Sequence, residues 1–415
     1  MSPTLPESLT PIILEQYGRS EKTFPLSALQ RSAIRASPLI DAVEVEPGRY
    51  QLRGTNHVGT ALLPGLRVIA RPRFKALGNV FFLLGYGDGL TRWGAQRFPY
   101  DVEADFFKAM AWLFESEIGQ ALRFGVLRGY EEREELLPTL RGRPDLTTQL
   151  RKAPGRPYPL ACRFVEFLDD TTFNRRLKAA IRRVRRLPGL DPSLALRLRH
   201  HLAAFANVTD APPGHFCDPP AQFNRLNEHW RGAAILARLI LDQRTLVDRH
   251  GRTQGITFAV DMNLLFEAFI RKVVGRIASQ RGFELAPEGQ TLPFSDKARM
   301  KPDLVLRRHG VALAVADAKY KAIVPAEKKW SHDNLYQLLA YCVAMNLRRG
   351  LLIYAESEGM QSRQTTKGIP KELRTEEVSL AGTPDQLVGR AEHVAHLLVG
   401  QATEHEVEQA LAGVA

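Results

Sequence analysis

Apolar residues recur every three to four positions in four segments of the chain, a spacing that predicts amphipathic helices. These segments cover residues 104–122, 174–187, 258–278 and 333–346. Between residues 49 and 74, β-prone residues alternate with turn pairs such as Pro64-Gly65, which predicts short strands. We therefore expect an α+β or α/β multidomain chain with a β-rich N-terminal part, a helical middle and a further mixed part at the C-terminal end.

The most informative pattern is a predicted β-hairpin, KPDLVLRRHGVALAVADAKYK, at residues 301–321. Because alternate residues of a strand share a face, Asp317 and Lys319 point to one side. A run of alanines points to the other side and leaves room for a closely packed helix. Asp303, at the start of the neighbouring strand, can reach the same point beyond the sheet. Three charges are thus expected to meet at the rim of an apolar sheet.

Two carboxylates that converge at a buried rim are unfavourable unless a cation lies between them. Mg²⁺ fits Asp303 and Asp317, because it prefers oxygen ligands and keeps several water molecules. Lys319 could then orient or activate a water and meet the charge that develops on a phosphate, as metal-assisted phosphodiester hydrolysis requires. A structural salt bridge between Asp317 and Lys319 is the alternative that the hairpin leaves open.

Three further side chains are predicted to lie near this rim. Glu267 falls on an apolar face of its predicted helix, where a metal site would explain a carboxylate. The alternative is that Glu267 reaches water or pairs with Arg271. Gln337 and Tyr341 are four residues apart and share a helix face, from which they could bind a phosphate or the attacking water. For these two, ordinary polar surface is the alternative.

The charge balance favours a polyanionic partner. The 415 residues contain 57 Lys and Arg against 45 Asp and Glu, a formal net charge of +12. Such an excess favours nucleic acid or an anionic membrane, although a basic surface without a specific partner is the alternative. The candidate DNA contacts are Arg182 and Arg183 on the basic helix at 174–187, Lys321 at the end of the hairpin, and Tyr341. For the helix, a solvated basic face is the alternative.

Other features favour a cytoplasmic location and no membrane partner. The three cysteines form no CxxC pair, which fits a reducing compartment. The N-terminal residues lack a signal-peptide pattern, and no apolar run approaches the roughly 20 residues of a membrane span. The sequence also lacks a G-x-x-x-x-G-K-[ST] phosphate loop, so we expect this chain to bind no nucleotide itself.

Breaks in these patterns predict three parts and a helical tail. The parts are residues 1–152, a helical connecting region at 153–250, and residues 251–415. In the tail, Thr383 to Gln386 and Thr403 to Glu406 both match the capping-box pattern, which predicts two helices.

A family resemblance follows from these residues and their flanking segments. The helix with Glu267, the hairpin with Asp303, Asp317 and Lys319, and the helix with Gln337 together resemble the PD-(D/E)xK nuclease superfamily. An ordered series of blocks is more specific and resembles the McrC family. The blocks are HVGTALLPGLRVIARPRF (57–74), NVFFLLGYG (79–87), LRGRPDL (140–146), DDTTFNRRLKAAI (169–181), DMNLLFEAFI (261–270), KPDLVL (301–306), DAKYK (317–321) and YQLLAY (336–341).

The resemblance implies a place in a McrBC-like restriction system directed against 5-methylcytosine and used in phage defence. McrC is the endonuclease subunit of such a system, and McrB is a hexameric AAA+ GTPase. The N-terminal region of McrC inserts into the pore of McrB and stimulates nucleotide hydrolysis. Residues 1–152 would accordingly bind the motor. Residues 251–415 would form a PD-(D/E)xK restriction-endonuclease-like domain, a central mixed sheet flanked by helices.

The resemblance also implies roles for single residues. Asp303, Asp317 and Lys319 carry over as the catalytic core, with Glu267 and Gln337 in support. Asp303, Asp317 and Glu267 would bind Mg²⁺, with Mn²⁺ as a substitute. Cleavage of both DNA strands favours a meeting of two nuclease domains. Two alternatives remain: a stand-alone repair or recombination nuclease of the superfamily, and an adaptor that activates an NTPase but has an impaired nuclease site.

Overall fold

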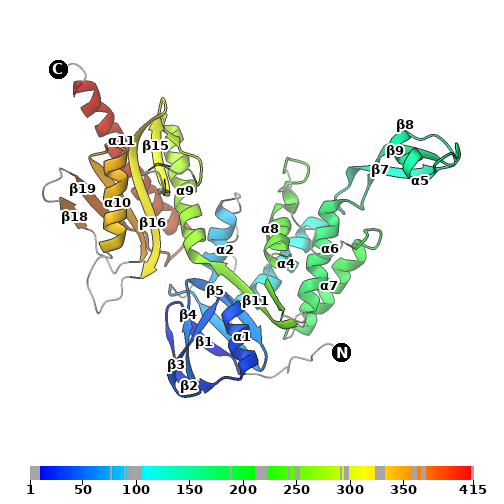
Figure 1. The fold of residues 1–415 in the computed structure, drawn as a ribbon, viewed down its shortest axis with the longest axis horizontal. Helices are drawn as coiled ribbons and strands as arrows, with labels where there is room; N and C mark the ends of the chain where they lie inside the picture. The colour runs from blue at the N-terminus through cyan, green and yellow to red at the C-terminus, as the bar shows by residue number, and fades with distance from the viewer. Residues whose placement is uncertain are drawn as a thin grey trace. The chain divides into compact units, whose positions relative to one another are not determined.

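The computed structural model divides the chain into two compact units (Figure 1). Unit 1 comprises Phe107–Arg244, and unit 2 comprises Leu9–Phe106 together with Thr245–Ala415. Both helices and strands are present, which confirms the predicted mixed α+β class. The structure describes residues 10–74, 77–87, 90, 93, 105–186, 189–210, 223–241, 244–247, 253–289, 292–293, 299–322, 332–356, 362–365 and 371–412.

The N-terminal part of unit 2 holds two sheets around one core. The first has the strand order β1 (Ile12–Glu15), β6 (Leu66–Arg71), β5 (His57–Leu63), β11 (Thr253–Asp261) and β10 (Arg244–Val247). The second has the order β2 (Arg19–Pro25), β4 (Arg49–Gly54) and β3 (Ile40–Glu46). Helix α1 (Ala28–Ala36) begins with a capping box formed by Ser27 and Gln30. Buried residues from α1 and from both sheets, including Ile34, Leu52 and Val68, pack in this core.

Strands β5 and β11 join parts of the chain that are far apart in sequence. They pair antiparallel, with Val58 opposite Val260. Gly59 permits this pairing, because a Cβ atom there would lie 1.8 Å from the carbonyl oxygen of Phe258. The two units divide the chain at residues 106/107 and 244/245, whereas the predicted boundaries are at residues 152 and 250.

The C-terminal part of unit 2 is built on a six-stranded mixed sheet. The order is β12 (Glu284–Leu285), β15 (Leu304–Arg308), β16 (Val311–Ala322), β17 (Arg349–Glu356), β19 (Glu372–Glu377) and β18 (Ser362–Thr365). Strands β16, β17 and β19 are parallel, and β15 and β18 run antiparallel to their neighbours. A separate two-stranded pair consists of β13 (Leu292–Pro293) and β14 (Arg299–Met300).

Helices cover both faces of this sheet. Helix α10 (His332–Ala344) packs on the face that carries Val315, through buried residues such as Leu338 (Figure 1). Helices α9 (Met262–Gln280) and α11 (Pro384–Ala412) pack against each other and against β16. The ring of Phe266 on α9 meets the ring of Tyr320, which lies on the same face of β16 as the buried Ala316 and Ala318. The alanine face of the predicted hairpin is thus the face on which a helix packs closely.

Two helix boundaries differ from the prediction. Helix α9 begins at Met262 rather than 258, because the residues before it pair as β11 and Asp261 Oδ1 accepts the backbone N–H of Asn263 at 2.8 Å. The tail forms a single helix from Pro384 to Ala412, so the prediction of two helices is wrong. The hydroxyl of Thr403 donates to the carbonyl of Val399 within this helix and caps nothing. The capping box at Thr383 is confirmed.

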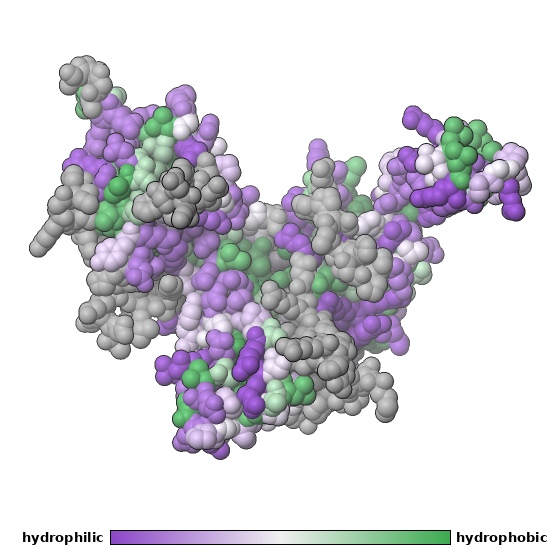
Figure 2. Space-filling model, in the orientation of Figure 1, coloured by the Kyte–Doolittle hydropathy of each residue, from purple (hydrophilic) through white to green (hydrophobic). Residues whose placement is uncertain are grey.

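Unit 1 combines helices with a β-ribbon. Its helices are α4 (Phe106–Leu122), α5 (Leu146–Lys152), α6 (Thr172–Arg185), α7 (Pro192–Ala204), a 3-10 turn η2 (Glu228–Trp230) and α8 (Arg231–Leu241). The ribbon has the strand order β7 (Gly129–Leu137), β9 (Leu160–Leu168) and β8 (Arg143–Pro144). The connecting region predicted to be helical is therefore helical only from residue 172, because the alternating side chains of LACRFVEFL form β9. The ribbon and α5 expose large side chains, among them Tyr130, Leu146 and Leu150. Figure 2 shows hydrophobic surface, drawn green, over this part of unit 1.

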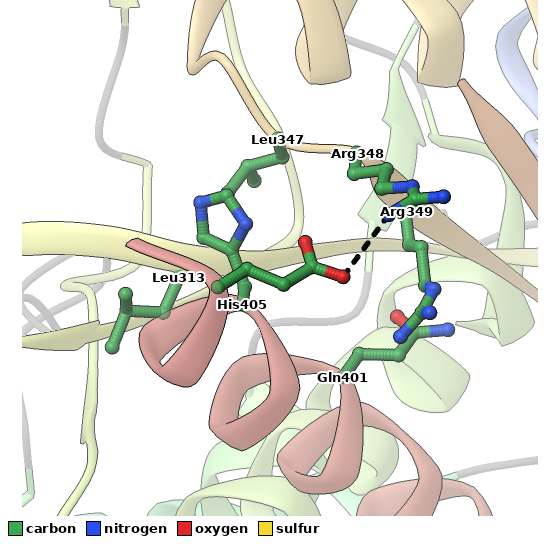
Figure 3. A pocket seen from close by; sticks show the side chains of 7 residues that line it. Leu313, Leu347, Arg348, Arg349, Gln401 and His405 are labelled. Carbon is green, nitrogen blue, oxygen red and sulfur yellow. Dashed lines mark hydrogen bonds and ion pairs between the residues drawn. The ribbon is translucent and has the colours of Figure 1, made fainter. Parts of the chain in front are cut away.

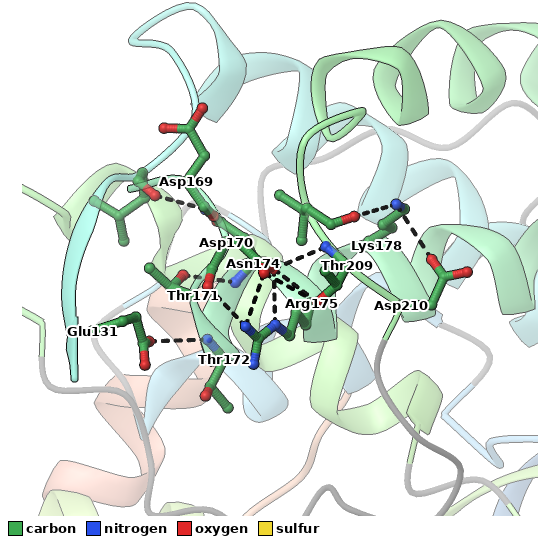
Figure 4. Close-up of polar contacts among 12 residues, drawn as sticks. Glu131, Asp169, Asp170, Thr171, Thr172, Asn174, Arg175, Lys178, Thr209 and Asp210 are labelled. Atoms are coloured by element: carbon green, nitrogen blue, oxygen red, sulfur yellow. Dashed lines mark hydrogen bonds and ion pairs between the residues drawn. The ribbon is translucent and has the colours of Figure 1, made fainter. Parts of the chain in front are cut away.

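The start of α6 is anchored by one carboxylate (Figure 4). Asp170 accepts hydrogen bonds from the Arg175 guanidinium at 2.8 and 2.9 Å. It also accepts from the backbone N–H of Thr209 at 2.8 Å and from its hydroxyl at 2.9 Å. These donors, Arg175 first, lower the pKa of Asp170 to about 2, although burial opposes the shift. The carboxylate thereby ties α6 to the segment that follows α7.

In the part of the chain that the structure describes, no helix is both long enough and apolar enough to cross a membrane.

Candidate active site

Three charged side chains meet where β15 begins and β16 nears its end. Asp303 precedes β15, and Asp317 and Lys319 lie on β16. The Lys319 Nζ atom lies 2.7 Å from Asp317 Oδ2 and 3.6 Å from Asp303 Oδ2. The structure thus brings together the three residues that the sequence placed at one rim, with the ammonium group close to both carboxylates.

The position of Asp303 is fixed by hydrogen bonds on both its side chain and its backbone. Its Oδ2 atom accepts the backbone N–H of Ala318 at 2.9 Å, which holds the carboxylate across the hairpin. Arg271, on α9, donates to the carbonyl of Asp303 at 2.9 Å and also to the carbonyl of Ala286. Arg271 therefore clamps the backbone beside the cluster rather than pairing with Glu267.

Asp317 is the most deeply buried charge of the cluster, with an exposed fraction of 0%. Within the described residues, neither of its carboxylate oxygens has a partner with hydrogen-bond geometry, although the Lys319 ammonium lies nearby. Burial raises the pKa of Asp317 to about 7, the charge of Asp303 adds to the shift, and Lys319 opposes it. Burial alone would lower the pKa of Lys319, but the two aspartates outweigh burial and raise it.

Glu267 contributes to the same electrostatic environment from α9. Burial raises its pKa to about 7, with a further increase from Asp303 and a decrease from Lys319. No hydrogen bond or ion pair satisfies its carboxylate among the residues that the structure describes. A half-buried carboxyl that titrates near neutral pH beside two aspartates is typical of a functional site.

Gln337 and Tyr341 lie together on α10, but they differ in exposure. Gln337 is exposed and its amide donates to Tyr341 Oη at 2.6 Å. Tyr341 is buried, and its hydroxyl donates to the carbonyl of Lys301 at 3.1 Å. Burial raises the pKa of Tyr341 to about 12. The predicted direct contact of Tyr341 with DNA disagrees with this burial; the side chain instead holds α10 to the segment before Asp303.

The other candidate DNA contacts do not join the cluster. Arg182 and Arg183 lie on α6 in unit 1. Arg182 forms an ion pair with Asp210, and Arg183 donates to the carbonyl of Leu241 at 3.3 Å and has its pKa lowered by burial. Arg183 therefore links α6 to α8, whereas Arg182 stays partly exposed. The side chain of Lys321 lies outside the described residues.

The donor set fits a metal ion bound by two carboxylates. No three carboxylate, imidazole or thiolate groups among the described residues come close enough to form a metal site by themselves, so Glu267 is not assembled with Asp303 and Asp317 as a third ligand. Mg²⁺ commonly takes one or two carboxylates and completes its shell with water and substrate phosphates. Asp317 offers its buried Oδ1, which lacks a hydrogen-bond partner among the described residues, whereas its Oδ2 lies 2.7 Å from Lys319 Nζ. Asp303 keeps part of its carboxylate exposed.

Two small cavities lie in the C-terminal part of unit 2, one of them beside the charge cluster. One is lined by Leu313 on β16, by Leu347 to Arg349 before and in β17, and by Gln401, His405 and Glu408 of α11 (Figure 3). Another lies beside Asp303 and is lined also by Arg271 and Arg307. Each offers only about 10 Å³, a space for a single water molecule, so neither is a ligand pocket.

Two of the supporting contacts have no direct signal in the sequence. Arg271 lies four positions after Glu267, and this spacing predicts an ion pair between the two side chains. It does not predict the hydrogen bonds from Arg271 to backbone carbonyls. Asn334 on α10 donates to the hydroxyl of Tyr354 on β17 at 3.2 Å, and both side chains are buried. Each contact depends on how elements pack in three dimensions.

Comparison with known proteins identifies the class of this chain. It is a component of a restriction system. The chain belongs to the family described as McrBC 5-methylcytosine restriction system component, whose model matches residues 52–355. The resemblance to the McrC family is thereby confirmed.

One solved structure shares this fold. A chain in a refined half-complex from a tetradecameric assembly of Thermococcus gammatolerans McrB AAA+ hexamers with bound McrC is 19% identical, with a TM-score of 0.57 over 93% of this chain and 100% of that chain. A chain in the cryo-EM structure of the Thermococcus gammatolerans McrBC complex is 21% identical over 65% of this chain and 88% of that chain, but its TM-score of 0.42 is too low to carry an argument. No curated protein sequence matches this chain.

Proposed function

We propose that this chain is the Mg²⁺-dependent DNA endonuclease subunit of a McrBC-like restriction system. In this proposal it cuts DNA when assembled with a hexameric AAA+ GTPase that recognises 5-methylcytosine, and it stimulates nucleotide hydrolysis by that partner. Membership of the family and the fold shared with a chain of the McrB–McrC assembly support the proposal. The observation that carries it is the meeting of Asp303, Asp317 and Lys319 at one sheet rim.

The chemistry divides among these residues. Asp303 and Asp317 would hold the Mg²⁺ ion, or Mn²⁺ in its place. When bound, the ion would polarise the scissile phosphate and lower the pKa of a water. Lys319 stays protonated beside two carboxylates, so its ammonium can meet negative charge that develops on the phosphate. Glu267, with a pKa of about 7, can accept a proton near neutral pH. Gln337 is exposed on α10 and can orient a water.

Asp317→Asn tests the site. We expect at least about a hundredfold loss of DNA cleavage, because a metal-ion contribution of several kcal/mol is removed. Stimulation of the partner's GTP hydrolysis should be unchanged, because the substitution keeps the size and shape of the buried side chain. The matched control is Asp41→Asn on β3, an exposed aspartate. Full cleavage by Asp317→Asn would refute the assignment.

An adaptor function is the second candidate, and one observation favours it. Lys319 already lies between the two aspartates, and within the described residues no three-ligand metal site is assembled. An adaptor would stimulate the partner fully and cut no DNA with Mg²⁺ or Mn²⁺. Cleavage by the wild-type chain with its partner excludes this candidate, and cleavage without any partner would instead favour a stand-alone nuclease.

One nuclease site cuts one DNA strand at a time, so two sites that act together cut both strands most directly. We therefore expect two copies of the chain to meet on DNA, and mixed complexes of wild-type and Asp317→Asn chains should accumulate nicked rather than linear DNA.

A further inference from the structure

The turn between β1 and β2 contacts the strand that carries the candidate active site. Tyr320 directly follows Lys319 on β16. Its hydroxyl donates to the side-chain oxygen of Gln16 at 2.5 Å. The hydroxyl of Tyr17 donates to the backbone carbonyl of Tyr320 at 3.2 Å. These partners are separated by more than 300 positions in sequence but belong to the same unit.

These contacts occupy an edge of β16 that no strand covers in the described part of the chain. Pairing with β15 ends where Leu304 lies opposite Ala316. Beyond this point, the N–H of Ala318 donates to Asp303. Backbone groups of alternate residues point to the same edge of a strand, so the carbonyl of Tyr320 lies on this edge too. Side chains of Asp303 and Tyr17 therefore hold the segment in which Lys319 lies.

The same turn also reaches the helix that carries Glu267. The Gln16 amide donates to the carbonyl of Asn56 at 2.8 Å. The Asn56 amide donates to Asp261 Oδ1 at 2.6 Å, and Asp261 caps α9. Gln16 is only 2% exposed, so its amide is committed to these contacts. One turn thus attaches both β16 and the start of α9.

We propose that Gln16 and Tyr17 are positioning residues for the candidate active site. They fix the end of β16, and with it Lys319, relative to α9 and Glu267. This inference rests on the proposed nuclease function. It gives the N-terminal sheets of unit 2 a supporting role at the active site, in addition to the proposed binding of the motor.

Tyr17→Phe tests the inference in the full chain with its partner. Tyr17 is 43% exposed, so loss of its hydroxyl should leave the fold intact. We expect kcat for DNA cleavage to fall about two- to tenfold, the effect of one hydrogen bond, with KM and stimulation of GTP hydrolysis unchanged. Amide hydrogen exchange in residues 317–322 should become faster. The matched control is Tyr50→Phe on β4, whose ring stacks on Arg31 and whose hydroxyl has no hydrogen bond among the described residues.

A second pair of variants addresses the same link. Gln16→Ala and Tyr320→Phe remove opposite ends of one hydrogen bond, so the double variant should cut no more slowly than the slower single variant. Unchanged cleavage and unchanged exchange in Tyr17→Phe would overturn the inference, as would an equal loss of cleavage and of GTPase stimulation. If the wild-type chain and partner cut no DNA, the proposed function fails, and hydrogen exchange alone decides whether Tyr17 holds β16.

Discussion

Asp317 and Lys319 form an ion pair whose net contribution to stability is small. Transfer of both charges out of water opposes folding, and their mutual attraction offsets only part of that penalty. Asp317 is fully buried and its oxygens lack partners with hydrogen-bond geometry in the described part of the chain. Such an arrangement is poor at stabilising a sheet. The proposed nuclease function gives both charges a task, because metal-assisted phosphodiester hydrolysis needs such groups at one point.

The residue scale also shows what the sequence can and cannot predict. Alternation along one strand was enough to place Asp317 and Lys319 on one face, because strand geometry is local. The burial of Tyr341 was not predictable, since helical spacing shows which residues share a face but not what covers that face. The backbone clamp by Arg271 likewise required the packing of α9 beside β15.

Asp170 gives a prediction about stability and pH. Its folded pKa of about 2 lies below the ordinary value of 3.8, so its contribution is present above pH 3.8 and is lost as the pH falls through 2. We expect Asp170→Asn to lower the free energy of unfolding by about 1–2 kcal/mol at pH 7. The difference from wild type should shrink between pH 5 and pH 2.

Urea unfolding of the full chain at several pH values measures this difference. Asp41→Asn serves again as the control, since that exposed aspartate has no side-chain hydrogen bond or ion pair among the described residues. A difference for Asp170→Asn that stays constant with pH would show that the Arg175 and Thr209 contacts do not depend on the charge of Asp170.

At the scale of elements, local sequence patterns predict whether a segment is a helix or a strand better than they predict where it begins and ends. The hairpin turn at His309-Gly310 forms as expected, with both residues at positive φ. The ends of α9 and α11 depend on contacts that cannot be predicted from the spacing of apolar residues. Pairing with β5 draws the residues before Met262 into a sheet, and Thr403 bonds within a continuous helix.

Packing between α10 and β17 gives a prediction at this scale. A Cβ atom at Gly350 would lie 2.7 Å from Cys342 Sγ and 2.9 Å from Leu338 Cγ. Gly350→Ala should therefore force α10 away from the sheet and destabilise unit 2 by about 1–3 kcal/mol. The control is Gly389→Ala on α11, where a Cβ meets nothing within 4 Å. That substitution should stabilise by about 0.5–1 kcal/mol, because alanine is the better helix former.

Thermal unfolding of both variants tests the contrast. Equal melting temperatures for Gly350→Ala and wild type would mean that α10 can shift freely, and the helix would then be a poor support for Gln337.

At the scale of the whole molecule, the proposed function and the net charge of +12 together predict salt-dependent binding to DNA. Contacts with phosphates release bound counterions, so the affinity for unmodified DNA should fall at least about tenfold when salt rises from about 50 to 200 mM. Fluorescence anisotropy with a short duplex measures this dependence. A weak response to salt would contradict a phosphate-based interface and would favour recognition by the partner alone.

The family could be predicted from the sequence, but the packing of distant segments against each other could not. The ordered blocks were enough to indicate the family, and the family model spans residues 52–355. The pairing of β5 with β11 could not be predicted, because a strand pattern does not name its partner. This pairing, together with contacts such as that of Gln16 with Tyr320, joins two separate segments of the chain and makes unit 2 discontinuous.

That discontinuity has a consequence for synthesis on the ribosome. Strand β5 ends at Leu63, and β11 begins only at Thr253. At roughly 5–20 residues per second, the edge of β5 waits roughly 10–40 s for its neighbour. During this interval, an apolar strand edge near the N-terminus is open to other nascent chains, so a chaperone that shields the emerging polypeptide should raise the yield of active protein.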